Sequence, residues 1–79
     1  MTRQELDDRY GKVKVSFEEY YKFVFTFVGE SDGDRIVAHV GGDAGEIYRE
    51  QVDNEPVPIS ALMPYAVYVN GVEVFNDND

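Results

Sequence analysis

Cysteine is absent from the 79 residues of this chain. Its absence excludes disulfide bonds and thiolate metal sites, and it removes the thiolate nucleophile that many enzymes use. A core built from so short a chain is near the lower limit at which a fold is stable without such a cross-link. Stability must therefore come from apolar packing or from a partner chain, and we expect one small domain over residues 1–79.

Long apolar stretches are missing as well. No segment approaches the ~18 consecutive apolar residues of a transmembrane helix. The first ten residues, MTRQELDDRY, lack the basic and apolar regions of a signal peptide. Tryptophan is absent too, but six tyrosines and five phenylalanines supply material for a compact aromatic core. These features predict a folded, soluble, cytoplasmic protein that does not contact a membrane.

Basic residues are few, since seven Lys and Arg stand against 16 Asp and Glu, a formal net charge of −9. Residues 1–28 contain equal numbers of each sign, so all of the net negative charge lies in residues 29–79. An acidic surface of this kind repels nucleic acid and anionic lipid and attracts basic protein surfaces. The same charge also serves solubility alone.

The first local pattern is that of a helix over residues 3–10. Thr2 and Glu5 form the capping-box pair T-x-x-E, in which each side chain accepts a hydrogen bond from the backbone amide of the other residue. Leu6 and Tyr10 lie one turn apart on the same side of this helix. Because a helix of two turns is marginal in water, we expect it to dock on the core.

After this helix the apolar period changes to two, which is the period of a strand. Segments 12–17 and 21–27 alternate in this way, and a three-residue loop over 18–20 would pair Phe17 with Tyr21. Both apolar rows then lie on the same side of the sheet, which predicts a β-hairpin.

A third strand is predicted over residues 35–40, RIVAHV, joined to the second by the polar loop GESDGD. One register matches three apolar residues of each strand, which pairs Phe27 with Ile36, Phe25 with Ala38 and Phe23 with Val40. Residues 46–52, EIYREQV, have two mixed faces and predict an edge strand after the loop GGDAG.

The last third of the chain contains all three prolines, within residues 53–64, which restricts that segment to extended or turn backbone with at most one helical turn. Within it, Ile59, Leu62 and Met63 are expected to plug one end of the sheet. Residues 65–75 predict a hairpin, because Asn70-Gly71 fits a type I′ turn that pairs Val69 with Val72. Residues 76–79 are interpreted as a flexible tail.

Together these patterns predict a mainly β protein, a small antiparallel sheet or barrel of about six short strands with one short N-terminal helix. The alternative is an α+β fold with a second helix near residues 17–24. That alternative remains open because Phe17, Tyr20, Tyr21 and Val24 also fit a period of 3.6.

The stretch 29–46 concentrates glycines, carboxylates and the only histidine, which raises the question of a metal or phosphate site. Counted from Glu30, an EF-hand loop needs glycine at its sixth position and glutamate at its twelfth, but Arg35 and Gly41 stand there. The phosphate-binding glycine fingerprints are missing as well. We therefore expect neither a metal nor a cofactor, with weak, nonspecific cation binding by the loop carboxylates as the alternative.

The histidine, His39, falls on the strand face opposite to the phenylalanines, beside Thr26 or Val24, and no carboxylate is forced next to it. It is interpreted as a partly exposed strand residue, and no residue is assigned a catalytic role. An enzyme that uses His39 and nearby acids is the class of function with the least support.

The expected function is therefore that of a non-enzymatic acidic interaction module, a small subunit or regulator that docks a basic surface on a protein partner. One alternative is a nucleic-acid mimic that inhibits a DNA- or RNA-binding protein, and another is a small-molecule binder in a barrel mouth lined by Tyr48, Tyr65 and Tyr68. Lys12, Lys14 and Lys22 are expected to face away from the partner. The expected partner contacts are Asp32, Asp34, Asp43, Glu46 and Glu50.

Overall fold

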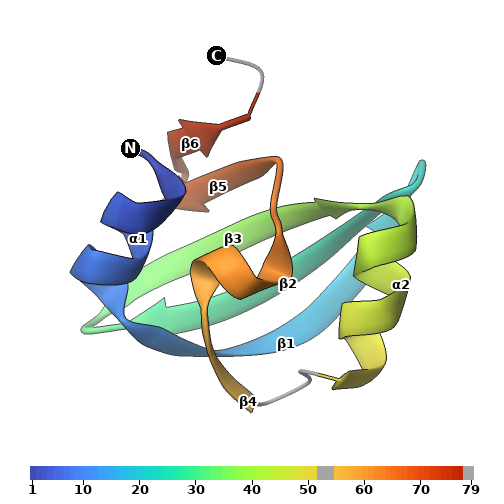
Figure 1. Cartoon of the computed structure of the whole chain (residues 1–79), viewed down its shortest axis with the longest axis horizontal. Helices are drawn as coiled ribbons and strands as arrows, with labels where there is room; N and C mark the ends of the chain where they lie inside the picture. Colours follow the sequence, from blue (N-terminus) through green and yellow to red (C-terminus); the bar gives the residue numbers. More distant parts are fainter. Residues whose placement is uncertain (52–54, 78–79) are drawn as a thin grey trace.

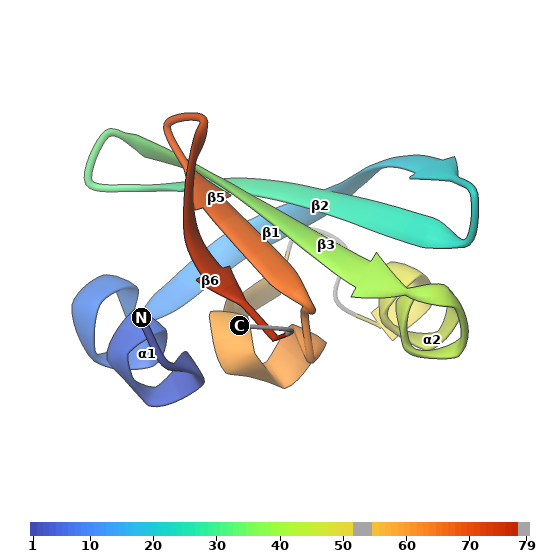
Figure 2. The same ribbon diagram turned by 90° about the horizontal axis from the view of Figure 1, so that it is seen from above.

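A computed structural model describes residues 1–51 and 55–77. Six antiparallel strands form one sheet in the order β4-β1-β2-β3-β5-β6, with three helical segments on one face of it (Figure 1, Figure 2). The elements are α1 (Arg3–Tyr10), β1 (Lys12–Tyr21), β2 (Val24–Ser31), β3 (Asp34–Gly41), α2 (Gly42–Gln51), β4 (Glu55–Pro58), η1 (Ile59–Leu62), β5 (Ala66–Val69) and β6 (Val72–Asn76). The mainly β fold with six strands and an N-terminal helix is confirmed. The barrel is wrong, because β4 and β6 stay unpaired with each other as the two edges of an open sheet.

The helix α1 forms as its capping box predicts. Thr2 Oγ1 accepts a hydrogen bond from the Glu5 amide at 3.1 Å, and Glu5 Oε1 accepts one from the Thr2 amide at 3.1 Å. Leu6 is fully buried in the core. Asp7 accepts hydrogen bonds from the amide and the hydroxyl of Ser60, which fixes α1 to the 3₁₀ helix η1. The short helix is therefore docked rather than free.

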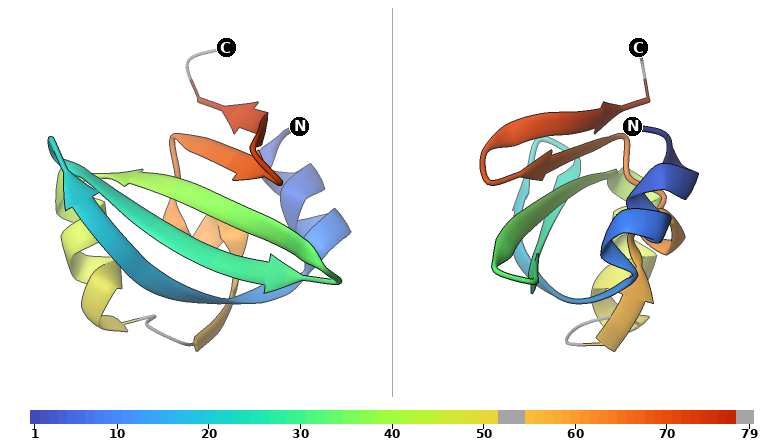
Figure 3. Two further views of the ribbon diagram at one scale, coloured as in Figure 1. Left: turned by 180° about the vertical axis from the view of Figure 1, so that it is seen from behind. Right: turned by 90° about the vertical axis from the view of Figure 1, so that its left-hand side faces the viewer.

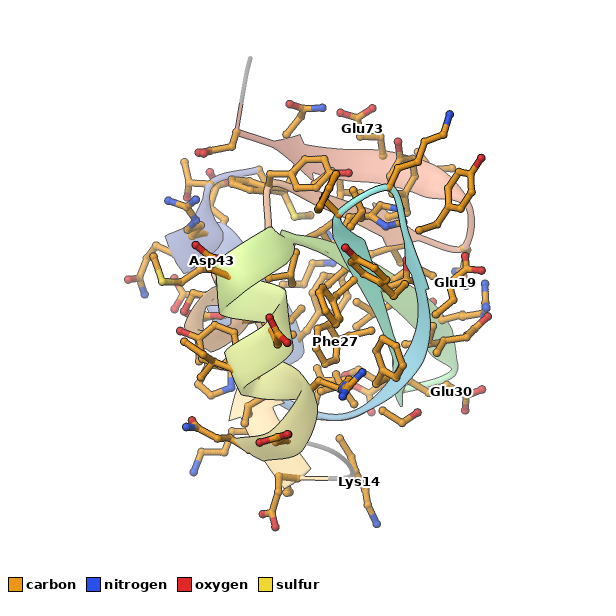
Figure 4. All side chains as sticks on the ribbon, turned by 90° about the vertical axis from the view of Figure 1, so that its right-hand side faces the viewer. Lys14, Glu19, Phe27, Glu30, Asp43 and Glu73 are labelled. Atoms are coloured by element: carbon orange, nitrogen blue, oxygen red, sulfur yellow. The ribbon has the colours of Figure 1, made fainter. Side chains whose placement is uncertain are left out.

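The core lies between the sheet and the helical segments. Alternate residues of β1, β2, β3 and β5 face α1, α2 and η1, and in the described part of the chain no element covers the opposite, open face of the sheet (Figure 3). Phe27 has no exposed surface and lies between α2 and the strands in Figure 4. The apolar core consists of Leu6, Val13, Val15, Phe25, Phe27, Ile36, Ala38, Val40, Ile59, Leu62, Ala66 and Val67.

The first hairpin turns later than predicted. β1 continues through residues 18–20 to Tyr21, and the turn is formed by Lys22 and Phe23, whose φ angles are both positive at 50° and 66°. Phe23 was expected in the core beside Phe25, but it is 75% exposed. The prediction failed because this turn contains no glycine or asparagine, the residues that normally mark positive φ.

A β-bulge at Glu18 sets the side-chain direction at the end of β1. Phe17 pairs with Phe27, and after the extra residue Tyr20 pairs with Phe25. The bulge lets Phe17 and Tyr20, three residues apart, both face the aromatic side of β2. The alternative of a helix near residues 17–24 is wrong, because this segment is strand and turn.

The β2–β3 register differs from the prediction by two residues. Phe27 pairs with Ala38, and Gly29 pairs with Ile36. A shift of two preserves the side-chain parity, so the predicted strand faces are still correct. Gly29, expected in a loop, belongs to β2 instead. This glycine serves the close approach of two strands, because a Cβ atom there would lie 2.7 Å from the carbonyl oxygen of Lys14.

Residues predicted as an edge strand over 46–52 are helical instead, as part of α2, except Val52, which lies outside the described residues. Ala44 and Tyr48, one turn apart, pack against the core. The glycines at the start of α2 concealed this helix, because each costs about 1 kcal/mol relative to alanine. Over residues 1–51 and 55–77, no helix is long and apolar enough to cross a membrane.

The proline segment forms the short strand β4 and the single-turn helix η1. Ile59 and Leu62 are buried, as expected for a plug. Met63 was expected beside them but is 61% exposed, because the chain leaves η1 there in the left-handed conformation with φ 52°.

The C-terminal hairpin has the predicted turn. Asn70 and Gly71 have φ angles of 51° and 84°, and Val69 pairs with Val72. Asn76, assigned to the tail, instead pairs with Ala66 at the end of β6. Residues 78 and 79 of the predicted tail lie outside the described residues.

Candidate functional site

The five acids expected to contact a partner lie at two ends of the molecule. Asp32 and Asp34 are at the β2–β3 turn, whereas Asp43, Glu46 and Glu50 are on α2 (Figure 1). The eight residues of β3 separate these two groups by roughly 25 Å at about 3.3 Å per residue. They therefore form two acidic regions and not one.

One acid of the β2–β3 turn, Asp34, takes part in structure. Asp34 Oδ1 accepts a hydrogen bond from Asn70 Nδ2 at 3.0 Å, and Asn70 Oδ1 accepts one from the Arg35 amide at 2.9 Å. These bonds connect the β2–β3 turn to the β5–β6 turn, and the two lie near each other in Figure 2. In the described part of the chain, no three His, Asp or Glu side chains are arranged to hold a metal ion.

The acids of α2 lie on one exposed face of the helix. Asp43, Glu46, Ile47 and Glu50 have the spacing i, i+3, i+4, i+7, which places them along one side. All four are exposed, and Ile47 retains 53% of its surface. We call these four residues the acidic face of α2. It combines negative charge with an apolar side chain that the fold does not use.

A cleft of about 310 Å³ lies beside this face, between the N-terminal half of α2 and the β1–β2 turn. Its lining residues are Tyr20, Phe23, Phe25, Gly42, Asp43, Glu46 and Arg49. Two of the predicted partner residues are therefore next to three aromatic side chains. The sequence pattern did not show this cleft, because α2 and the late turn were both missed.

Two backbone features hold the walls of the cleft together. The Gly42 amide donates a hydrogen bond to the Phe23 carbonyl at 2.8 Å, which ties the start of α2 to the turn. Gly45 lies directly on the ring of Phe25, where a Cβ atom would be 2.4 Å from Cδ1. The helix approaches β2 this closely only because residue 45 has no side chain.

Four aromatic rings form a continuous row that leads into the cleft. The centroid of Phe17 is 5.7 Å from that of Phe25, Phe25 is 4.5 Å from Tyr20, and Tyr20 is 6.5 Å from Phe23. Arg49 Cζ lies 5.5 Å from the Phe17 centroid, so a cation of the protein itself covers one end of this aromatic row. The other end, Tyr20 and Phe23, is exposed.

The three lysines expected to face away from the partner differ in position. Lys12 and Lys14 are on β1, where Lys14 pairs with Glu30 on the open face. Lys22 is in the same turn as Phe23, and its Nζ lies 5.2 Å from the Tyr21 ring. One of the three lysines thus belongs to the turn whose next residue, Phe23, lines the cleft.

His39 lies on the open face of the sheet, as predicted. It pairs with Thr26, and its Nδ1 is 3.2 Å from Thr26 Oγ1. The rings of Tyr65 and Tyr68 are 6.2 Å and 5.6 Å from it. Tyr48 is on α2, on the opposite side of the sheet, so these tyrosines do not line one common mouth.

Residues 29–33, GESDG, match the letters of the G-x-S-x-G motif of serine hydrolases. That motif needs a sharp turn from a strand into a helix, but here the segment is a hairpin between two strands. The Ser31 hydroxyl donates to the carbonyl of Tyr10 at 3.2 Å. His39 pairs with Thr26, which is five residues from Ser31 along β2. His39 is therefore roughly 16 Å from Ser31 at about 3.3 Å per residue, too far to act as its base.

Comparisons with protein-family models, curated proteins and solved structures find no match for this chain. Any function must therefore be argued from the site itself.

Proposed function

We propose that this protein is a non-enzymatic interaction module whose acidic face of α2 docks a basic surface on a protein partner. The observation that carries this proposal is the exposed row of Asp43, Glu46 and Glu50 around the exposed Ile47. The ion pairs of the described residues join Arg3 with Asp77 and Arg35 with Glu18, so none of them involves these three carboxylates, although Arg49 lines the cleft beside Asp43 and Glu46.

The mixture of charge and apolar surface suits protein recognition. Carboxylates at the rim of an interface attract a basic partner and raise its association rate, whereas an apolar side chain at the centre adds to the lifetime of the complex. Ile47 lies between Glu46 and Glu50 on the helix and is in the central position of this arrangement.

The alternatives receive less support from the arrangement of side chains. A nucleic-acid mimic needs carboxylates spaced along one continuous surface, as phosphates are along a strand. Here the acids of the β2–β3 turn and those of α2 are at opposite ends of β3. The tyrosine-lined mouth has no barrel to form it, and Tyr48 is separated from Tyr65 and Tyr68 by the sheet.

The test begins with affinity capture of the partner from the native source and its elution with salt. Association rates are then measured across ionic strength for a triple variant, Asp43→Asn with Glu46→Gln and Glu50→Gln. We expect association to slow about tenfold at low salt and to lose most of its salt dependence, because electrostatic steering acts on the encounter.

A matched control removes the same number of charges from other elements, by Glu19→Gln with Glu30→Gln and Glu73→Gln. These residues lie around the strands, away from α2, in Figure 4. Its association rate should stay within about twofold of that of the unmodified protein. Equal slowing in both variants would mean that net charge alone acts, and no slowing in either would reject the acidic face of α2 as the docking surface.

A further inference from the structure

The cleft beside α2 has the chemistry of a receptor for one cationic side chain. Tyr20 and Phe23 present aromatic surface, with 49% and 75% of each residue exposed. Asp43 and Glu46 line the same cleft, and their two carboxylates exceed the single positive charge of Arg49, which lines it too. Aromatic faces and carboxylates together attract a guanidinium or an ammonium group more strongly than either does alone.

The protein already uses this chemistry within its own fold. Arg3 Cζ lies 5.3 Å from the Phe75 centroid while its Nη2 is 3.2 Å from Asp77 Oδ1. That pair lies in a larger groove of about 970 Å³ between the start of α1 and β6. The ring and the carboxylate of that groove are therefore already engaged by an arginine of the chain.

The aromatic row beside α2 is only half covered in this way. Arg49 lies over Phe17 at one end, and among the described residues no cation lies over Tyr20, Phe23 or Phe25. The uncovered end is the one that the cleft exposes. A volume of about 310 Å³ is at the lower limit for small-molecule pockets and suits a single side chain.

We propose that this cleft binds one arginine side chain of the protein partner, stacked on Phe23, the more exposed ring, beside the nearly perpendicular ring of Tyr20, and paired with the carboxylate of Glu46. This inference rests on the proposed docking of a basic partner and names its anchoring contact. Arginine fits better than lysine because its planar guanidinium stacks on rings and offers a fork of donors to a carboxylate. The hydrogen bond from Gly42 to Phe23 holds the two walls at a fixed separation, so the site is formed before binding.

The test titrates isotope-labelled protein with three short peptides that differ only in their central residue, which is arginine, lysine or citrulline. Citrulline has almost the shape of arginine but no charge. We expect saturable shifts of the Tyr20, Phe23 and Glu46 resonances with the arginine peptide, weaker shifts with lysine and none with citrulline. Equal binding of citrulline would overturn the proposal.

Variants distinguish the cleft from the acidic face of α2. Phe23→Leu keeps an apolar side chain in the turn but removes the aromatic ring, and it should weaken arginine-peptide binding about 2- to 30-fold. Val72→Ala, an exposed apolar residue on β6, should leave it unchanged. If Phe23→Leu has no effect while the α2 triple variant still slows the captured partner, the docking proposal stands and the arginine site is rejected. If the arginine peptide binds but the partner ignores the triple variant, which also removes the Glu46 carboxylate, the cleft accepts a guanidinium that the partner does not supply, and both proposals are overturned.

Discussion

The β1–β2 and β5–β6 hairpins have the same two-residue turn geometry but very different residues in it. At both turns the two central residues have positive φ, which is the requirement of a type I′ turn. Asn70-Gly71 is the preferred sequence for that backbone, whereas Lys22-Phe23 is among the least suited, because a bulky side chain is strained at positive φ. The fold therefore reaches the same turn once by local preference and once against it.

The difference lies in what each turn contacts. Asn70 bonds through its side chain to Asp34 and to the Arg35 amide, so this turn strengthens the sheet. Phe23 gains no such support from its side chain, which is exposed, and its carbonyl is held by Gly42 at the start of α2. Left-handed backbone costs about 1–2 kcal/mol at a residue other than glycine. Strain of this kind is concentrated at functional sites, which agrees with a role of Phe23 in binding.

The largest expected effect separates the core from the strained turn. Phe27→Ala should lower the free energy of unfolding by about 3–5 kcal/mol, because it removes a fully buried ring. Phe23→Ala should change it by less than about 0.5 kcal/mol, because the ring is largely exposed. Urea denaturation of both variants provides the measurement. Similar losses at the two positions would show that Phe23 belongs to the core, and the contrast between the turns would disappear.

A smaller effect is expected where α2 meets β2. Gly45→Ala forces a methyl group into the ring of Phe25, and we expect a net loss of about 1–2 kcal/mol, since overpacking exceeds the gain in helix propensity. Gly41→Ala is the matched control, because a Cβ atom there meets nothing within 4 Å. Thermal and urea denaturation of both variants give the comparison. A Gly45→Ala protein as stable as the control would mean that α2 does not depend on this close approach.

The smallest effect tests the strain directly. Replacing Lys22-Phe23 by Asn-Gly should raise the free energy of unfolding by about 1 kcal/mol, because these residues adopt positive φ readily. The reverse exchange, Asn70→Lys with Gly71→Phe, should destabilise the protein. Urea midpoints at constant slope give both values. A stabilised Asn-Gly variant that has also lost arginine-peptide binding would show that stability and recognition compete at this turn.

The same contrast explains which parts of the fold the sequence could predict. The capping box at Thr2 and the Asn70-Gly71 turn are local signals, and both predicted elements formed where expected. The Lys22-Phe23 turn carries no such signal, so the first hairpin was placed too early. Helix α2 begins with glycines that oppose helix formation, and it forms because Ala44 and Tyr48 find the core, which is tertiary information.

The candidate site was predictable only in part, for a related reason. Charge counting identified Asp43, Glu46 and Glu50 as exposed acids, but an extended strand would have placed Glu46 and Glu50 on one face without Ile47 beside them. The cleft depends on the bulge at Glu18, which turns Tyr20 toward Phe25. Neither the bulge nor the helix has a sequence signature strong enough to be recognised before the contacts are known.

The short strand β4 determines how one edge of this sheet behaves toward other copies of the protein. Pro56 and Pro58 pair with alternate residues of β1, and prolines within sheets are found where the missing amide hydrogen would face away from the neighbouring strand. A further strand that approached β4 would lack two hydrogen-bond donors on this edge, because Pro56 and Pro58 have no amide hydrogen. Addition of a further strand is therefore opposed on the β4 side of a sheet this rich in aromatic and β-branched residues.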